Sequence, residues 1–275
     1  MLLLPNCKIN IGLNIVGKRP DGYHNLETVF YPIPLRDNLE FKEINEEEGL
    51  FKLILGGAPI EGNPEQNLIV KVYLALKEEF HLPALELSLY KHIPMGAGLG
   101  GGSSDAASMM KGLNEHYELG LTQAEMERRL VKVGADCPFF VRNKPAFATG
   151  IGDELSDCHV SLKGKYIVLV KPDVFVSTKE AYAHVVPQPA RIPLCEAIAQ
   201  PIEHWKDMVT NDFEKSVFPN HPKLPAIKQT LYDMGALYAA MSGSGSTIFG
   251  IFDRPMPEAK TVFKPHFVFM QKLIR

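Results

Sequence analysis

The residues best suited to chemistry lie in one glycine-rich stretch between residues 91 and 113. Ser103, Ser104 and Asp105 follow its glycines directly, and a helical pattern begins there. The glycines are Gly96, Gly98, Gly100, Gly101 and Gly102. Because glycine has no Cβ, this backbone can turn its N–H groups inward and let an anion approach closely. Ser103 or Ser104 is expected to cap the helix, whose N-terminus carries partial positive charge, so the stretch predicts a phosphate-binding site.

Two common phosphate-binding motifs do not explain this stretch. A P-loop requires a lysine directly after its second conserved glycine, and Gly102 stands at that position. Three of the glycines match the G-x-G-x-x-G pattern, but a dinucleotide-binding fold needs a helix and then a strand with an acidic residue. Here a second helix follows instead, as the capping-box pair Thr122 and Glu125 indicates. A nicotinamide- or flavin-dependent oxidoreductase is therefore disfavoured.

Polar residues in two other places could complete such a site. Residues 7–16 alternate, which puts isoleucines on one face of a strand and Lys8 and Asn10 on the other. Asp136 comes just after a helix, among proline and aromatic neighbours where a carboxylate needs a partner. From the residues alone, a solvated strand face and an ordinary turn aspartate remain alternatives.

An aromatic pair follows a tight turn early in the chain. The sequence PDG is a strong turn signal, and Tyr23 and His24 come directly after it. Together they could stack on a nucleobase and hydrogen-bond to it. A surface loop without a ligand is the ordinary alternative.

Hydrophobic periodicity predicts the elements that must position these residues. In the first part of the chain we expect strands at 7–16, within 27–44 and at 50–55 and 84–91, with a turn at LRDN (35–38) inside 27–44. We also expect a strand and turn at 145–155, and a helix at 67–80 capped by Asn67. In the second part we expect a strand at 166–172, helices within 177–235, two strands around the SGSGS turn in 237–252, a helix at 257–264 and a strand at 266–270. This second order is that of a ferredoxin-like, split βαβ arrangement.

Composition excludes several classes of protein. The chain has 275 residues, 45% hydrophobic and 22% charged, which suits one large or two medium domains with a real core. A net charge of −3 argues against nucleic-acid binding. The four cysteines lie far apart and predict neither a zinc site nor a disulfide framework. No apolar run suggests a membrane span or signal peptide, so we expect a cytoplasmic protein.

Three motifs, in order, resemble the signatures of the superfamily of galactokinase, homoserine kinase, mevalonate kinase and phosphomevalonate kinase. They are KINIGLNI near the N-terminus, PMGAGLGGGSSDAA in the glycine-rich stretch, and MSGSGST near the C-terminus. The resemblance implies an α+β, two-domain kinase fold. Its N-terminal mixed α/β domain, of a ribosomal-protein type, would span 1–156, and its ferredoxin-like domain 157–275.

Within that superfamily, further segments resemble the 4-diphosphocytidyl-2-C-methyl-D-erythritol kinases. They are NCKINIGLNIVGKRPDGYHNLETVF, the triple glycine in GLGGGSSDAA, and KVGADCPFFV. The resemblance runs from about residue 5 to residue 249 and is thin in 185–235. It implies transfer of the γ-phosphoryl group of ATP, with Mg²⁺, to the 2-hydroxyl of the methylerythritol unit, a step of non-mevalonate isoprenoid (terpenoid) biosynthesis.

The same resemblance assigns roles to residues. Asp136 would be the catalytic base, with Lys8 beside it polarising the hydroxyl, and Ser104 would be a ligand of Mg²⁺. Residues implied in ATP binding are Asn67, Lys91, Pro94, Met95, Gly96, Ala97, Gly98, Leu99, Gly100, Gly101, Gly102, Ser103, Ser104, Gly243 and Ser244. Residues implied in binding the cytidyl substrate are Asn10, Tyr23, His24 and Tyr182. The role of Asp105 stays open, because its charge suits the helix dipole but repels phosphate.

Two alternatives remain. One is another small-molecule kinase of the superfamily, for mevalonate or homoserine, against which PDGYH and GADCPFF speak. The other is a non-catalytic nucleotide-binding protein, against which Lys8 and Asp136 speak, since binding ATP requires neither. In every case we expect small-molecule partners, no nucleic acid or membrane, and a monomer or weak homodimer.

Overall fold

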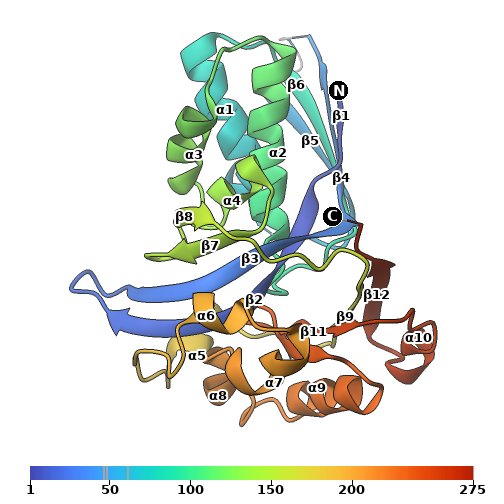
Figure 1. Cartoon of the computed structure of the whole chain (residues 1–275). Coiled ribbons are helices and arrows are strands. Elements are labelled where there is room, and N and C mark those ends of the chain that lie inside the picture. Colours follow the sequence, from blue (N-terminus) through green and yellow to red (C-terminus); the bar gives the residue numbers. More distant parts are fainter. Residues whose placement is uncertain (46, 48, 61, 275) are drawn as a thin grey trace. The chain divides into compact units, whose positions relative to one another are not determined.

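The computed structural model describes residues 1–45, 47, 49–60 and 62–274, which form two compact units (Figure 1). Unit 1 comprises Met1–Cys7, Leu35–Met95 and Gly100–Lys144. Unit 2 comprises Lys8–Pro34, Gly96–Leu99 and Pro145–Arg275. Unit 2 thus draws on both predicted domain ranges, 1–156 and 157–275. The domain boundary itself stays a prediction.

The sheet of unit 1 has the order β1-β4-β6-β5. Its strands are β1 (Leu2–Leu3), β4 (Asn38–Glu43), β5 (Phe51–Gly57) and β6 (Leu85–Lys91). β6 pairs antiparallel with β4 and parallel with β5. Leu85, Leu87 and Leu89 of β6 are buried, as the alternation predicts for one inward face. Lys91, which ends β6, lies on the same inward face.

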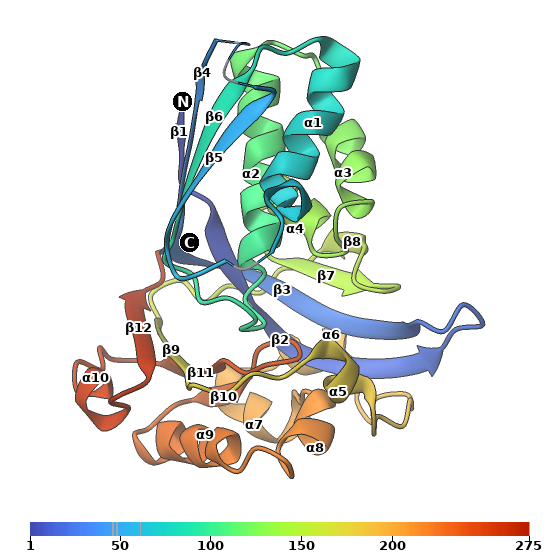
Figure 2. The ribbon, with the colours of Figure 1, turned by 180° about the vertical axis from the view of Figure 1, so that it is seen from behind.

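Helices cover one face of this sheet in both views (Figures 1 and 2). They are the 3₁₀ helix η2 (Pro64–Gln66), α1 (Leu68–Phe80), α2 (Gly101–His116), α3 (Gln123–Val131) and α4 (Cys137–Arg142). The Asn67 side chain accepts a hydrogen bond from the Ile69 N–H at 3.2 Å and caps α1, as predicted. The predicted capping box of Thr122 and Glu125 is also present. These local caps determine where α1 and α3 begin.

A second sheet, mostly in unit 2, has the order β2-β3-β7-β8. Its strands are β2 (Asn6–Lys18), β3 (His24–Arg36), β7 (Ala146–Thr149) and β8 (Glu154–Asp157). The strands expected over 27–44, with a turn at residues 35–38, are confirmed: the chain leaves this sheet after Arg36 and enters the sheet of unit 1 at Asn38. Asp37, between them, is fully buried.

A third sheet, which lies within unit 2, has the order β10-β11-β9-β12 with antiparallel pairs. Its strands are β9 (Tyr166–Lys171), β10 (Tyr238–Met241), β11 (Ile248–Phe252) and β12 (Phe267–Lys272). The helices are α5 (Thr178–Tyr182), α6 (Leu194–Ile198), η3 (Ile202–His204), α7 (Trp205–Met208), α8 (Phe213–Val217), α9 (Lys223–Asp233) and α10 (Ala259–Val262). α9 packs on β10 and β11. This strand order confirms the ferredoxin-like prediction.

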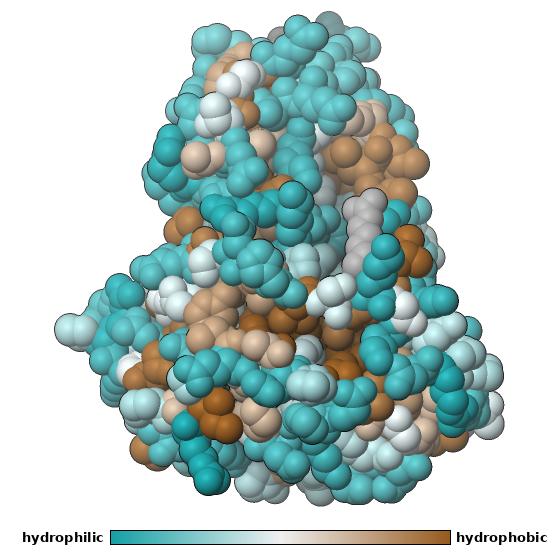
Figure 3. Space-filling model, in the orientation of Figure 1, coloured by the Kyte–Doolittle hydropathy of each residue, from teal (hydrophilic) through white to brown (hydrophobic). Residues whose placement is uncertain are grey.

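The surface of unit 1 differs between its helical and sheet sides. Figure 3 shows mainly hydrophilic side chains over the outer helices and a gathering of hydrophobic ones beside β1 and β4. Leu2 and Leu4 of that N-terminal segment are exposed. Among the described residues, no helix combines the length and apolarity needed to cross a bilayer.

Candidate active site

The glycine-rich stretch forms the connection into α2. Gly100 is the N-cap residue in a left-handed conformation (φ 67°), and no side chain caps the helix. The prediction that Ser103 or Ser104 caps α2 is therefore wrong, since both lie inside its first turn. The first N–H groups of α2 are not taken by a capping side chain, which is the arrangement that binds anions at helix N-termini.

The middle of the loop, Gly96–Leu99, is held within unit 2. The backbone N–H of Lys8 in β2 donates to the carbonyl oxygen of Leu99 at 3.0 Å. The Ser242 hydroxyl, just after β10, donates to the carbonyl oxygen of Gly98 at 2.9 Å. These two bonds fix the loop against β2 on one side and against the β10–β11 turn on the other.

The turn between β10 and β11 carries the second predicted phosphate contact. Gly243 lies so close to the loop that a Cβ there would be 3.1 Å from Asn10 Oδ1 and 3.4 Å from the Gly98 oxygen. Asn211 donates through its amide to the Gly243 oxygen at 2.8 Å and holds the turn in place. Gly243, Ser244 and the loop therefore belong to one local cluster of backbone groups, and their binding to ATP stays a prediction.

Lys8 is buried on the polar face of β2, next to this cluster. Its side-chain nitrogen donates to Asn10 Oδ1 at 2.5 Å and to the Gly98 oxygen at 3.3 Å. The ammonium also lies 4.9 Å from the centre of the Phe30 ring. The alternative of a solvated strand face is thereby excluded, since Lys8 and Asn10 are each only 3% exposed. These contacts hold the ammonium on the buried face of β2, next to the glycine-rich loop.

Asp136 is the N-cap residue of α4, a helix that the sequence did not predict. Its carboxylate makes no capping bond to that helix. Burial raises the pKa of the neighbouring Cys137 thiol to about 11, so this cysteine stays protonated at neutral pH and is a poor nucleophile. Asp136 belongs to unit 1 and Lys8 to unit 2. Their pairing in catalysis therefore stays a prediction.

Two predicted aromatic residues lie together in unit 2. His24, at the start of β3, stacks on Tyr182, at the end of α5, with ring centroids 4.8 Å apart and planes inclined by 24°. Tyr182 also meets the edge of Phe213, at 4.7 Å between centroids. Tyr23 is exposed in the preceding turn. The His24–Tyr182 pair gives a surface on which a further flat ring could stack.

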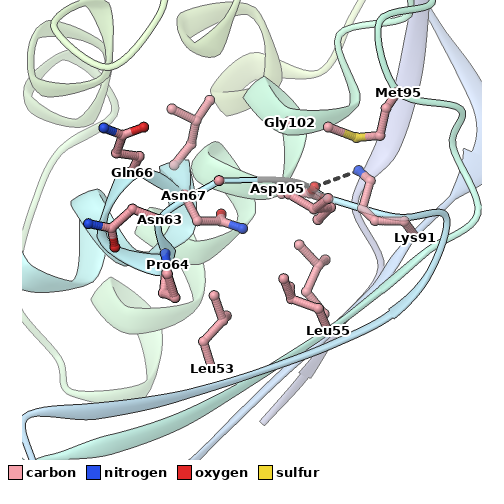
Figure 4. A pocket seen from close by; sticks show the side chains of 14 residues that line it. Leu53, Leu55, Asn63, Pro64, Gln66, Asn67, Lys91, Met95, Gly102 and Asp105 are labelled. Carbon is pink, nitrogen blue, oxygen red and sulfur yellow. Dashed lines mark hydrogen bonds and ion pairs between the residues drawn. The ribbon is translucent and has the colours of Figure 1, made fainter.

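A cavity of about 280 Å³ lies in unit 1 between the sheet and the start of α2 (Figure 4). Four of the residues predicted to bind ATP line it: Asn67, Lys91, Met95 and Gly102. The sequence did not foresee its apolar walls, which include Leu53, Leu55, Ile60, Leu68 and Leu89. Apolar walls with a few polar groups are typical of sites for small ligands.

A buried charge cluster forms the floor of this cavity. The Lys91 ammonium pairs with Asp37 and, at 2.7 Å, with Oδ2 of Asp105. Asp37 also accepts the backbone N–H groups of His92 at 2.6 Å and Ile93 at 2.8 Å. Asp105 thus pairs with a lysine, which gives its charge a partner inside the protein. Asp37 was missed from the sequence, where it lies in a segment read as a turn.

This cluster leads to a prediction about stability and pH. Burial raises the pKa of Asp105 from 3.8 to about 7, against the opposing effect of Lys91 and with a further rise from Asp37. Between these values the native state keeps a proton that the unfolded state has lost, so the free energy of unfolding falls as pH rises through this window. Asp105→Asn should remove that fall. Urea unfolding of both proteins between about pH 4.5 and 7.5 checks this, and a difference independent of pH would contradict it.

Comparison with known proteins gives consistent matches. The family pattern described as GHMP kinases N terminal domain matches residues 67–144, and that described as GHMP kinases C terminal matches 194–263. A 4-diphosphocytidyl-2-C-methyl-D-erythritol kinase of Bacteroides fragilis is 54% identical over 273 residues, covering 99% of this chain and 100% of that one. One from Porphyromonas gingivalis is 46% identical over 254 residues, covering 92% of each.

Solved structures agree with the fold. A crystal structure of 4-(cytidine 5'-diphospho)-2C-methyl-D-erythritol kinase superposes with a TM-score of 0.81 at 28% identity, covering 98% of both chains. The mevalonate kinase of Methanococcus jannaschii superposes with a TM-score of 0.68 at 14% identity, covering 99% of this chain and 98% of that one. The second likeness shows only that the fold is shared.

Proposed function

The chain belongs to the 4-diphosphocytidyl-2-C-methyl-D-erythritol kinases among the GHMP kinases, and we propose that it transfers the γ-phosphoryl group of ATP to the 2-hydroxyl of that cytidyl substrate. This is a step of isoprenoid biosynthesis by the non-mevalonate route. The observation that carries the choice of substrate is the stacked pair of His24 and Tyr182. Mevalonate and homoserine contain no nucleobase, so a kinase for either compound would not need an aromatic pair to stack on its substrate.

We assign the proton transfer to Asp136 and the orientation of the hydroxyl to Lys8. Asp136 accepts the proton of the attacking hydroxyl as it bonds to phosphorus. Lys8 holds and polarises that hydroxyl, and its buried side chain is already fixed by Asn10 and Gly98. Positioning of this kind supplies much of the rate in phosphoryl transfer.

We assign the ATP phosphates to the backbone of residues 94–104 and the β10–β11 turn. The uncapped N-terminus of α2 and the turn at Gly243 and Ser244 offer N–H groups without adding a negative charge. The base of ATP would enter the cavity of unit 1, between its apolar walls and beside Asn67 and Lys91. The substrate would use Asn10, Tyr23, His24 and Tyr182.

The protein groups present fit a magnesium ion that arrives with ATP. Among the described residues, no group of three or more His, Cys, Asp and Glu side chains gathers as a metal site. Mg²⁺ usually keeps several waters and is held largely by substrate phosphates. Ser104, in the first turn of α2, is the protein ligand that we propose. When bound, the ion would neutralise charge on the phosphate oxygens.

The substrate assignment predicts a strong preference for the cytidyl compound over methylerythritol phosphates that lack cytidine. Stacking of a base on an aromatic ring contributes about 1–3 kcal/mol, so Tyr182→Ala should reduce kcat/KM for the cytidyl substrate by roughly 10–100-fold. Steady-state kinetics with coupled ADP detection measures this. Tyr90→Ala, at an exposed position on the sheet of unit 1, is the control. Equal kcat/KM for both compounds in the native enzyme would remove the cytosine-binding role.

One assay separates the alternatives. ADP release is measured with the cytidyl substrate, mevalonate, homoserine and galactose in parallel. Turnover of mevalonate or homoserine alone would favour another kinase of the superfamily, and ATP binding without any turnover would favour a non-catalytic protein. Cytoplasmic location, a monomeric or weakly dimeric state and the lack of nucleic-acid binding stay predictions from the sequence.

A further inference from the structure

Thr28, in β3, is a fully buried polar residue beside the polar face of β2. Its hydroxyl donates to the backbone oxygen of Gly12 at 2.6 Å and accepts a hydrogen bond from the Asn10 amide at 3.0 Å. Both partners lie in β2. A buried hydroxyl costs free energy unless it is hydrogen-bonded, and a valine of nearly the same volume would not carry that cost. The two bonds to β2 are therefore what the hydroxyl adds at this position.

The hydrogen bonds from Lys8 through to Gly12 run in one direction. A backbone carbonyl only accepts, so Thr28 uses its single proton for Gly12 and offers lone pairs to Asn10. The end of the Asn10 amide that meets Thr28 must therefore be its NH₂ group. At the other end, the Lys8 ammonium only donates and meets the amide oxygen at 2.5 Å. Donor and acceptor chemistry at both ends thus requires the same orientation of the amide.

This orientation determines how the Lys8 ammonium is held. Asn10 Oδ1 and the Gly98 oxygen accept its hydrogen bonds at 2.5 and 3.3 Å. The Asn10 oxygen is closely surrounded, since a Cβ on Gly243 would lie 3.1 Å from it. Without the Thr28 hydroxyl, only the ammonium would orient the amide, and the two groups could move together. The hydroxyl therefore ties this pair to the backbone of β2.

We propose that Thr28 is a positioning residue for phosphoryl transfer, because it anchors the Asn10 amide that holds the Lys8 ammonium at the attacking hydroxyl. In this role it acts through Asn10 and not by contact with the reacting atoms. A displacement of about 1 Å at a reacting group can cost about 10²-fold in rate, so a fixed ammonium matters even where substrate binding does not change. The inference rests on the proposed function, because it names what fixes the lysine that we assign there to the hydroxyl.

Steady-state kinetics of two variants tests the hydroxyl directly. Thr28→Val loses the bond to Asn10 at nearly unchanged volume, and its kcat should fall roughly tenfold, within the range for a displaced reacting group. Its KM for ATP should stay within about twofold, because a loss confined to the transition state leaves ground-state binding unchanged. Thr28→Ser keeps the hydroxyl and should keep kcat within about twofold. Thr230→Val is the matched control with unchanged kcat, because its hydroxyl also donates to a backbone carbonyl, that of Ala226 at 2.9 Å, but in α9.

A double-mutant cycle tests whether Thr28 acts through Asn10. Thr28→Val is combined with Asn10→Ala, which removes the amide that the hydroxyl anchors. In that background Thr28→Val should alter kcat by less than about twofold, because the pair is coupled and its effect has no other route. An equal factor in both backgrounds would mean an independent, structural role and overturns the inference. A native kcat in Thr28→Val, or an equal loss in Thr28→Ser, overturns it too.

Misfolding of a variant and failure of the proposed function have separate readouts. If Thr28→Val does not fold, Thr28→Ala is compared with Thr28→Ser, since these two differ only in the hydroxyl, and equal kcat values overturn the inference. Every variant is assayed with the compound of the ADP-release panel that the native protein phosphorylates. Turnover of another compound in place of the cytidyl one overturns the proposed function but not the role of Thr28. Turnover of none of them overturns both.

Discussion

Replacing Asp136 by asparagine is expected to lower kcat by roughly 10²–10⁴-fold, the range for loss of a general base. Asparagine has nearly the same size, but its amide cannot take a proton from the attacking hydroxyl. Because the phosphate loop and the proposed adenine cavity do not include Asp136, binding of ADP should stay within about threefold of normal. Steady-state kinetics gives kcat, and calorimetry on the same preparation gives the affinity for ADP.

A second aspartate provides the control for that experiment. Asp157, in β8, is exposed, and Asp157→Asn removes the same charge from a position outside the proposed site. Its kcat should equal that of the native enzyme. Near-normal turnover in Asp136→Asn would refute the base assignment. A loss of ADP binding in that variant would instead indicate that Asp136 supports the fold around α4.

The features that the sequence predicted well depend on residues close together in the chain. Asn67 caps α1, and Thr122 and Glu125 form their capping box, because capping chemistry needs only the next two or three residues. The inward leucines of β6 follow from alternation alone. The strand order of the ferredoxin-like sheet was also predictable, since few connections between such elements are allowed.

The start of α2 shows where local reasoning fails. Glycine is a poor helix former, so the sequence favoured a cap at Ser103 or Ser104. The helix begins at Gly101 instead. A Cβ at Gly101 would lie 2.9 Å from the Ile93 side chain and 3.2 Å from the Lys91 ammonium. Packing against residues of an earlier segment requires glycine inside this helix, and no helix propensity contains that information.

The same limit applies to contacts between distant segments. Asp37 directly precedes β4, and Lys91 ends β6, more than 50 residues later. No pattern near either residue indicates that Lys91 pairs with both Asp37 and Asp105. The stacking of His24 on Tyr182 is of the same kind. Resemblance to a family supplied Lys91, His24 and Tyr182 but not Asp37, and the structure shows which of these residues lie together. Buried polar residues with long-range partners are therefore the part of the site that sequence patterns miss.

Gly98→Ala is expected to reduce kcat/KM for ATP by about 10²-fold, the effect of misplacing a reacting group by about 1 Å. Gly98 has φ +73°, and a Cβ there would lie 2.0 Å from the backbone oxygen of Ser242. The atoms that this Cβ would meet belong to the backbone and not to the end of a flexible side chain, so the loop backbone must shift. The shift breaks the bond from the Ser242 hydroxyl to the Gly98 oxygen and moves the N–H groups that we assign to the phosphates. Kinetics at varied ATP measures the loss.

Gly120→Ala separates displacement of the loop from simple backbone strain. Gly120 has nearly the same φ, +70°, but its Cβ would meet nothing within 4 Å. Both variants carry the cost of a side chain in the left-handed region, about 1 kcal/mol or more, so both should lose some thermal stability. Only Gly98→Ala should lose activity while it stays folded. Equal losses of kcat/KM in the two variants would mean that strain, and not the position of the loop, limits phosphoryl transfer. A selective loss in Gly98→Ala would tie catalysis to the contact between the loop and the β10–β11 turn, because that contact is what the added methyl group disrupts.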